Sequence, residues 1–411
     1  MQASTISRPA AEASPGRSLN VLMVGISDYI LTGVSGGDVR ERHIEYARRL
    51  NHLHMIVYSP RAHDLHTERI SENLTVYPTR SLSRATFVWD AFRIAARICR
   101  TQPIDLVTTQ DPFATGLVGL MVKRRFGIAL DVQSHSSFFD NPVWIAERPL
   151  RHGLFNRLGK AVARQADSMR VLTGDERDRA VEAGVVPDRI EIINTPVNVE
   201  RFLASPDPAA VDALRARLGL PAGAKIVLWV GRMVWFKRLP VLLEAFALIA
   251  AKHPDAYLVL AGDPDTAEGL AAHRLAGELC IADRVRFAGR VDHAGLPAYY
   301  ALADVYALSS IYEGFGKVLV EAAASGLPVV STATAGGREV VRDGETGLLA
   351  EVENPAGLAA KLDVLLSDPA LARQMGQRAR EHAARHYDRT HTIERIIDMW
   401  VRSAARHTAR R

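Results

Sequence analysis

The chain has 411 residues, a formal net charge of +5 and two cysteines, with 48% hydrophobic and 24% charged residues. This composition is typical of a globular protein of roughly two or three domains, and it excludes a fully disordered or disulfide-rich chain. The positive charge is too small and too spread out for a nucleic-acid-binding surface, so we expect no nucleic-acid partner. Cys99 and Cys280 have no neighbours at metal-ligand spacing and are expected to be reduced thiols.

Residues 1–18 are polar and lack the apolar segment of a secretory signal, so they are expected to form a disordered tail. The longest apolar runs, such as 245–251, are much shorter than the ~20 residues that span a bilayer. These features predict a cytoplasmic protein without a transmembrane helix.

In the first half, short apolar strands alternate with amphipathic helices. We expect strands at 19–25, 54–59, 74–77, 105–109, 128–133, 168–172 and 190–193, and helices at 38–50, 87–100 and 115–126. Such alternation predicts a doubly wound α/β sheet. Residues 19–203 are therefore expected to form one Rossmann-like domain.

The pattern restarts after a turn-rich stretch at 205–208. We expect strands at 225–231, 257–262, 284–288, 303–308, 328–331 and 347–350, and helices at 239–252 and 316–325. Residues 204–385 would form a second Rossmann-like domain, and a C-terminal helix in 386–411 would pack back on the first. Ligands of open α/β sheets bind outside the carboxyl ends of the strands.

Two cations follow the first strand of the second half. Arg232 comes directly after the strand and Lys237 lies five residues further on. A guanidinium group can bind a diphosphate bidentately and an ammonium group can bind it as a point charge. The alternative is a solvated start to the next helix.

The most informative segment is Glu-Gly-Phe-Gly-Lys-Val-Leu-Val-Glu, residues 313–321, which follows a predicted strand. Gly314 and Gly316 would let the backbone approach a ligand before a helix begins. The free amides of Lys317, Val318 and Leu319 would then point at a phosphate. Carboxylates at both ends of the segment suit hydroxyl groups of a sugar and a ribose.

These motifs, together with Gly336-Gly337-Arg338-Glu339 and residues 343–347, resemble the donor domain of the retaining GT-B glycosyltransferases of family four. The resemblance covers nearly the whole chain and is strong from about 225 to 385. It implies two Rossmann-like domains that face a cleft, with a nucleotide-diphosphate sugar as donor and a glycan or glycolipid as acceptor. It implies no metal and no organic cofactor. This agrees with the expectation that no Asp-x-Asp sequence lies near a strand end, where metal-dependent glycosyltransferases would need one to hold Mg²⁺ or Mn²⁺.

The resemblance also implies roles for individual residues. Arg232, Lys237 and the amides at Val318 and Leu319 would hold the diphosphate, Glu321 the ribose, and Glu313 the transferred sugar. His135 would face that sugar, and Gly36 and Gly37 would approach the phosphates or the acceptor. The donor site would comprise Gly36, Gly37, Arg232, Lys237, Arg290, Val291, Glu313, Gly314, Phe315, Gly316, Lys317, Val318, Leu319 and Glu321, with Glu313, His135, Arg232 and Lys237 as catalytic residues. Arg290 and Val291 would lie beside the base, which the sequence does not identify.

One segment departs from the family pattern. Residues 195–198, Thr-Pro-Val-Asn, stand where the family often has Asn-Gly-Val-Asp, so we expect a changed hinge or acceptor pocket. A sugar-nucleotide epimerase of the same fold, and a nucleotide-sugar-binding module without activity, remain alternatives. A nicotinamide oxidoreductase does not fit, because no Gly-x-Gly-x-x-Gly follows the first strand.

The excess positive charge lies in the first half. Residues 81–164 hold twelve Lys/Arg and six Asp/Glu, a net +6, so the rest of the chain carries −1, which is 5 − 6. Arg93, Arg97 and Arg100 share a helix with aromatic residues, which suits the surface of an anionic membrane. The alternative is a core-packing helix with a solvated basic face. The first interpretation predicts a peripheral protein at the inner face of the membrane, with a lipid-linked acceptor.

Overall fold

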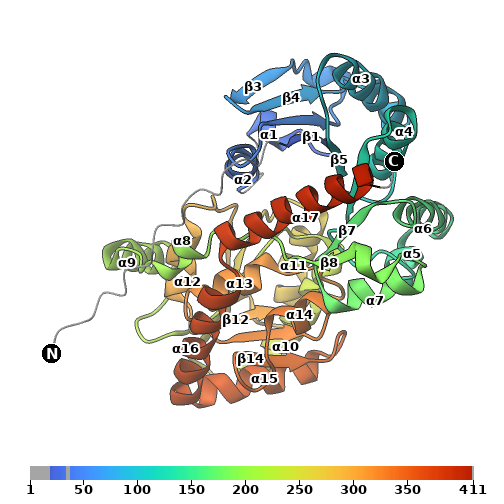
Figure 1. The fold of residues 1–411 in the computed structure, drawn as a ribbon. Helices are drawn as coiled ribbons and strands as arrows, with labels where there is room; N and C mark the ends of the chain where they lie inside the picture. Colours follow the sequence, from blue (N-terminus) through green and yellow to red (C-terminus); the bar gives the residue numbers. More distant parts are fainter. Residues whose placement is uncertain (1–18, 34–37, 410–411) are drawn as a thin grey trace.

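The computed structural model describes residues 19–33 and 38–409, which form two parallel-sheet α/β domains (Figure 1). The predicted tail at 1–18 and the predicted glycine pair Gly36 and Gly37 lie outside the described residues. The fold class expected from the sequence is confirmed.

The first domain is built on an eight-stranded sheet with the order β3-β4-β2-β1-β5-β6-β7-β8. Its strands are β1 (Asn20–Gly25), β2 (His52–Val57), β3 (Glu68–Ser71), β4 (Leu74–Pro78), β5 (Leu106–Thr109), β6 (Ala129–Gln133), β7 (Ser168–Val171) and β8 (Ile190–Ile192). All neighbours run parallel except β3 and β4. The prediction missed β3, a polar edge strand whose Glu68 and Arg69 are exposed and carry no apolar signal.

Helices cover this sheet. They are α1 (Tyr29–Thr32), α2 (Val39–Ala47), α3 (Phe87–Thr101), α4 (Ala114–Phe126), α5 (Pro142–Glu147), α6 (Pro149–Ala163) and α7 (Gly174–Glu182). The central strands β1 and β5 are almost entirely buried, as expected for strands with helices on both faces.

The second domain is built on a six-stranded, wholly parallel sheet with the order β11-β10-β9-β12-β13-β14. Its strands are β9 (Lys225–Val230), β10 (Ala256–Ala261), β11 (Val285–Gly289), β12 (Val305–Leu308), β13 (Val329–Thr332) and β14 (Gly347–Ala350). Its helices are α9 (Pro208–Arg217), α10 (Leu239–Lys252), α11 (Ala267–Glu278), α12 (Leu296–Leu302), α13 (Lys317–Ala324), α14 (Ala335–Val340), α15 (Pro355–Ser367) and α16 (Pro369–His386).

The strand order of the second sheet reverses between β9 and β12. The chain winds outward from β9 to β11 and then returns to place β12 on the other side of β9. In doubly wound sheets, the loops that leave the two strands at such a switch point separate and form the ligand-binding crevice. The loops after β9 and β12 are therefore where a ligand is expected.

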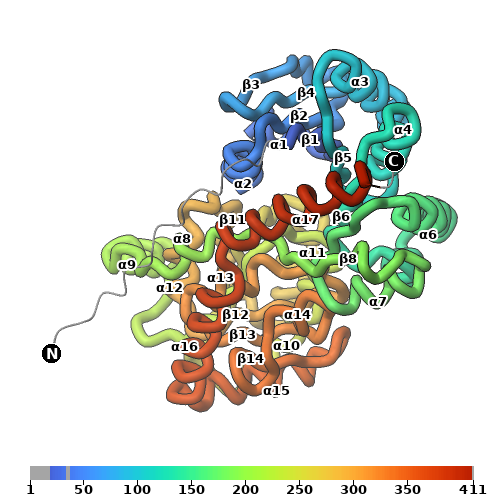
Figure 2. Tube along the Cα trace, in the orientation of Figure 1, coloured from blue at the N-terminus to red at the C-terminus, as the bar shows by residue number. Residues whose placement is uncertain are grey.

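Two helices join the domains. The short α8 (Val199–Leu203) contributes Val199 and Phe202 to the core of the second domain. The last helix, α17 (Arg389–Ala409), crosses back from α16 to the first sheet (Figure 2). Its Trp400 is fully buried in the first core and donates its indole N–H to Asp131 Oδ2 at 2.9 Å. The first core is thus completed by the end of the chain.

Candidate functional site

The loop after β9 presents the two predicted cations. Arg232 follows the strand and is exposed, whereas Lys237 ends a short 3-10 helix, Trp235–Lys237, and is buried. The Lys237 ammonium group forms an ion pair with the Glu313 carboxylate, from the loop after β12. The structure therefore brings together two of the predicted catalytic residues at the switch point.

Hydrogen bonds hold these two loops against each other. The Ser309 hydroxyl group donates to the Lys237 carbonyl oxygen at 2.8 Å, and the Ile311 amide donates to the Phe236 carbonyl oxygen at 2.9 Å. Glu313 in turn accepts a bond from the Gly336 amide at its carbonyl oxygen, at 2.9 Å. The loops after β9, β12 and β13 are thus fixed relative to one another.

Gly314 and Gly316 occupy positions that a side chain would disturb. Gly316 caps α13 with a φ of +75°, which favours glycine. A Cβ atom on Gly314 would lie 2.4 Å from the His135 carbonyl oxygen, in the loop after β6 of the first domain. The two domains touch at this point, and the predicted His135 is a neighbour of the predicted donor loop.

The start of α13 offers fewer free amides than the sequence predicts. The Lys317 and Val318 amides have no backbone partner within the described part of the chain, but the Leu319 amide donates to the Gly316 carbonyl oxygen at 2.9 Å. The ring of Phe315 is buried and meets Tyr387 edge to face at 5.6 Å, so this side chain serves the core.

The Lys317 side chain turns to the other domain. Its ammonium group lies 2.8 Å from Oδ1 of Asp38, which is buried just before α2. Arg42 also pairs with Asp38, at 3.2 Å. Burial raises the pKa of the Asp38 carboxyl group, but Arg42 and Lys317 outweigh it and hold the pKa well below its ordinary value. Together with the contact of Gly314 and His135, this pair defines what we call the interdomain seam.

His135 is neutral at the seam. Its side chain is exposed, although protein atoms surround much of the ring. This enclosure, with the positive charges of Arg170 and Arg42, lowers the pKa of His135 below its ordinary value. Water that reaches the ring screens part of these effects, but their direction leaves an uncharged imidazole at neutral pH.

Glu321 lies deeper in the second domain and is only 3% exposed. Its Oε2 accepts a hydrogen bond from the Tyr300 hydroxyl group at 3.0 Å, and its Oε1 lies 3.2 Å from Nε2 of His293. Burial and the Glu321 charge raise the pKa of Tyr300 well above its usual range, so this hydroxyl group keeps its proton. Arg290 and Val291 follow β11 at the sheet edge, with Arg290 exposed.

The sequence interpretation missed several residues that surround the site. His293 and Tyr300 contact Glu321 from a loop and from α12, where nothing in the sequence marks them as partners. Asn194 donates its side-chain amide to Glu339 Oε1 at 3.2 Å, across the two domains. The family motif at 336–339 could have pointed to Glu339, but the partner could not be foreseen.

The expectation that no Asp-x-Asp sequence lies near a strand end is wrong. Asp263 and Asp265 form an Asp-x-Asp sequence directly after β10, and the Asp265 amide donates to Asp263 Oδ1 at 3.1 Å, which closes a turn before α11. In residues 19–33 and 38–409, no three His, Cys, Asp or Glu side chains are placed to hold a metal ion.

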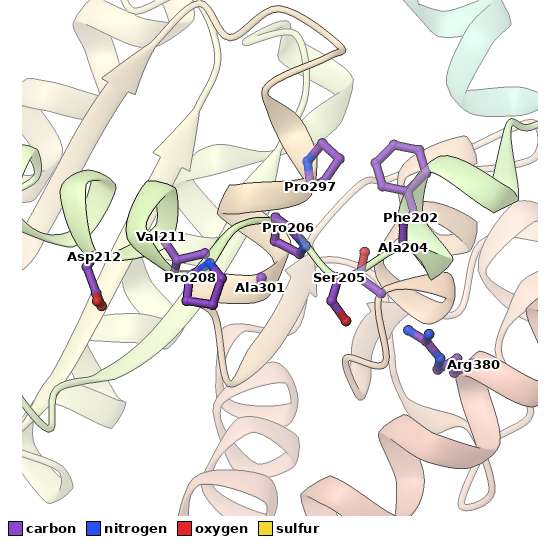
Figure 3. A pocket seen from close by; sticks show the side chains of 11 residues that line it. Phe202, Ala204, Ser205, Pro206, Pro208, Val211, Asp212, Pro297, Ala301 and Arg380 are labelled. Carbon is purple, nitrogen blue, oxygen red and sulfur yellow. The ribbon is translucent and has the colours of Figure 1, made fainter.

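A pocket of about 320 Å³ lies elsewhere, beside the segment that joins α8 to α9 (Figure 3). Its lining includes Pro206, Pro208 and Arg380, and none of the predicted donor-site residues. Both ends of the Arg380 guanidinium group donate to backbone carbonyl oxygens, of Ala324 and Leu203. This pocket is thus separate from the loops after β9 and β12.

Comparison with known sequences identifies the family. The model of the family "Glycosyltransferase Family 4" matches residues 41–201, and that of "Glycosyl transferases group 1" matches residues 211–382. The D-inositol 3-phosphate glycosyltransferase of Thermobispora bispora is 30% identical over 400 residues, which cover 91% of this chain and 92% of that protein. The protein of the same name from Thermomonospora curvata is 34% identical over 300 residues, covering 70% and 69%.

Solved structures share the fold. Sucrose-phosphate synthase from Thermosynechococcus elongatus superposes with a TM-score of 0.78 at 24% identity, covering 94% of this chain and 99% of that one. HepE from Anabaena, in complex with UDP-glucose, superposes with a TM-score of 0.75 at 20% identity. The match covers 94% of this chain and 100% of HepE. The chain belongs to the group 1 glycosyltransferases of GT-B fold. It is a glycosyltransferase, as the sequence resemblance predicted.

Proposed function

We propose that this enzyme transfers a sugar from a nucleotide-diphosphate sugar, bound at the switch point between β9 and β12. The observation that carries the proposal is the ion pair between Lys237 and Glu313, which joins the loops after β9 and β12, together with the Lys317 and Val318 amides at the start of α13. Arg232 is exposed on the same loop as Lys237. Cations and amides suit a diphosphate, and a carboxylate suits sugar hydroxyl groups. HepE, of the same fold, is known with UDP and with UDP-glucose.

We further propose that transfer is metal-independent and retains the configuration of the sugar. Negative charge develops on the diphosphate as its bond to the anomeric carbon breaks. Arg232, Lys237 and the N-terminus of α13 would neutralise that charge. The acceptor oxygen would attack from the same face, and its proton would pass to the leaving phosphate. Neutral His135 would contact the sugar at the seam without adding charge.

The acceptor is proposed to be a glycan or a glycolipid in cell-surface polysaccharide or glycolipid biosynthesis. The names of the relatives favour a second candidate, a small phosphorylated polyol such as D-inositol 3-phosphate. The two classes are separated by one assay, in which nucleotide release is measured with each donor and with either inositol 3-phosphate or lipid-linked glycans added. Stimulation by only one class identifies the acceptor.

A lipid-linked acceptor would require the enzyme to reach a membrane. No helix within the described ranges is both long and apolar enough to span one. Apolar side chains are nevertheless exposed near the start of α3, with Trp89 on the helix at 59% exposure and Leu82, in the segment before it, at 76%. Arg93, Arg97 and Arg100 are exposed on the same helix. We propose that this surface docks on anionic lipids at the inner face of the membrane.

The docking proposal is tested by co-sedimentation with vesicles that contain anionic lipid. Replacing Arg93, Arg97 and Arg100 by Glu should abolish binding at low salt. The matched control replaces three exposed arginines of α16, Arg373, Arg378 and Arg385, and should leave binding unchanged. Absence of wild-type binding at low salt would reject membrane docking and favour the soluble acceptor.

A further inference from the structure

His293 links Glu321 to an arginine from the interdomain connection. Its Nδ1 lies 2.6 Å from Nη1 of Arg201, on α8, and its Nε2 lies 3.2 Å from Oε1 of Glu321. The ring also meets Phe202 edge to face at 5.6 Å, which fixes its orientation. Arg201, His293 and Glu321 form a chain of contacts that we call the relay.

The chemistry of the relay sets the position of one proton. A guanidinium group can only donate, so Nδ1 of His293 must accept from Arg201. The proton of a neutral imidazole is then on Nε2, where it donates to the Glu321 carboxylate. Arg201 thus determines which tautomer His293 adopts, and that tautomer is the one that can hold Glu321.

Both oxygens of Glu321 are held but neither is saturated. Oε1 takes the bond from His293 and Oε2 the bond from Tyr300. A carboxylate has about four acceptor positions, so about two remain for a ligand. A ribose with neighbouring hydroxyl groups offers two donors, which matches the remaining capacity. Because the carboxylate is buried, its orientation has to be set by protein partners and not by water.

We infer that His293 is a positioning residue, which acts through Glu321 on the ribose of the donor, and that Arg201 fixes the tautomer that makes this work. The inference rests on the proposed nucleotide-sugar function. The relay also contacts the first domain, because Nη2 of Arg201 lies 3.7 Å from Oε2 of Glu41, on α2. The position of the ribose carboxylate is therefore tied to the connection between the domains.

The test measures binding of UDP and GDP, and of the matching 2′,3′-dideoxy diphosphates, by calorimetry. His293→Ala should lower the affinity for the ribonucleoside diphosphate by about tenfold, as expected for loss of a hydrogen bond to a charged group. The ligand compared is the one that the wild type binds. The same substitution should leave the affinity for the dideoxy compound unchanged, because that ligand has no ribose hydroxyl groups to donate to Glu321. His293→Gln keeps an N–H donor and should recover part of the loss.

A double variant isolates the route of the effect. Once Glu321 is replaced by Ala, adding His293→Ala should cause no further loss, because a positioning residue has nothing left to position. Arg201→Ala should follow the same non-additive pattern. The matched control is His253→Ala, since His253 pairs with the Asp363 carboxylate at 2.8 Å on the far side of the same domain, and binding should not change.

Three results would overturn the relay. They are unchanged ribonucleotide affinity in His293→Ala, an equal loss for the dideoxy compound, and losses that add in the double variant. Each leaves the donor site intact, provided that Glu321→Ala still weakens binding. If the wild type binds no nucleoside diphosphate, whatever its base, the proposed function itself fails, and the relay fails with it.

Discussion

The ammonium group of Lys317, in the first turn of α13, lies 2.8 Å from Oδ1 of Asp38, which precedes α2 in the other domain. The helix whose N-terminus faces the proposed diphosphate is thus tied directly to the first domain. The same loop contacts His135 through Gly314. The seam therefore places the donor loop and the first domain at a fixed separation, and a change of that separation should affect catalysis.

Gly314→Ala tests the seam. A Cβ atom would lie 2.4 Å from the His135 carbonyl oxygen, so the loop or the domains must move apart. We expect turnover to fall by roughly a hundredfold, because a misplacement of about 1 Å has this effect on a reaction that depends on orientation. Steady-state kinetics provide the measurement.

The control for this variant is Gly277→Ala, in the exposed part of α11, where a Cβ atom would meet nothing within 4 Å. This change should keep turnover and raise the free energy of unfolding by about 0.5–1 kcal/mol, as helical Gly-to-Ala replacements do. Normal turnover in Gly314→Ala would show that the seam does not constrain the reaction.

Replacement of Lys237 or Arg232 tests the cations at the switch point. Either change to Ala should lower turnover by roughly 10²–10³-fold, the usual cost of losing one preorganised group that stabilises transition-state charge. Lys252→Ala, which removes a lysine from an exposed pair with Asp363, serves as the control and should be neutral. Near-normal turnover of both variants at saturating donor would show that the diphosphate does not bind at Arg232 and Lys237.

The two glutamates should separate in their effects. Glu313→Gln should lower turnover by about tenfold or more without weakening UDP binding, because UDP lacks the sugar that Glu313 would contact and Lys237 stays in place. Glu321→Ala should instead weaken UDP binding by about tenfold. Kinetics combined with calorimetry distinguish the two roles. Equal losses of UDP affinity in both variants would contradict the division.

A third glutamate predicts a pH dependence of stability. Burial raises the pKa of Glu176, on α7, from an ordinary 4.5 to about 8, although the Leu172 amide donates to it. Since the folded value is the higher one, ionisation opposes folding, and stability should fall as pH rises from 4.5 towards 8. At pH 9 the free energy of unfolding should be lower than at pH 4.5 by on the order of 3–5 kcal/mol from this group.

Glu176→Gln should remove this loss of stability, because a glutamine side chain does not ionise. Its oxygen can still accept the hydrogen bond from the Leu172 N–H group. Urea denaturation from pH 5 to pH 9 gives the measurement. Glu182→Gln, on the exposed side of the same helix, shows what the loss of a surface carboxylate does by itself. If wild-type protein and Glu176→Gln lose stability in parallel between pH 5 and pH 9, Glu176 is not the cause.

Much of the fold follows from local sequence signals. The apolar runs at β9 and β14 predict strands, and the helix bounds of α10 agree with those predicted at 239–252. These elements are governed by periodicity and burial, which a single sequence displays. The polar strand β3 carries no such signal, because it pairs only at an edge and its side chains are exposed.

The sequence could predict only those site residues that are marked by their position directly after a strand. Lys237 and Glu313 follow strand ends, so their meeting at the switch point follows from the topology. The partners of Glu321 and of Lys317 depend on how distant segments pack, and His293 and Asp38 carry no local mark of that role. Asn198, read as a departure from the family pattern, caps α8 by accepting from the Arg201 amide at 3.3 Å.

The central claim is sugar transfer from a nucleotide-diphosphate sugar without a metal, by the groups at the switch point. Its most direct test is release of the nucleotide in excess EDTA, with a panel of donors and with inositol 3-phosphate or lipid-linked glycans as acceptors. The account predicts acceptor-dependent release by the wild type that chelator does not reduce and that Lys237→Ala largely loses. Release that stops in EDTA and returns with Mg²⁺ or Mn²⁺ would contradict it.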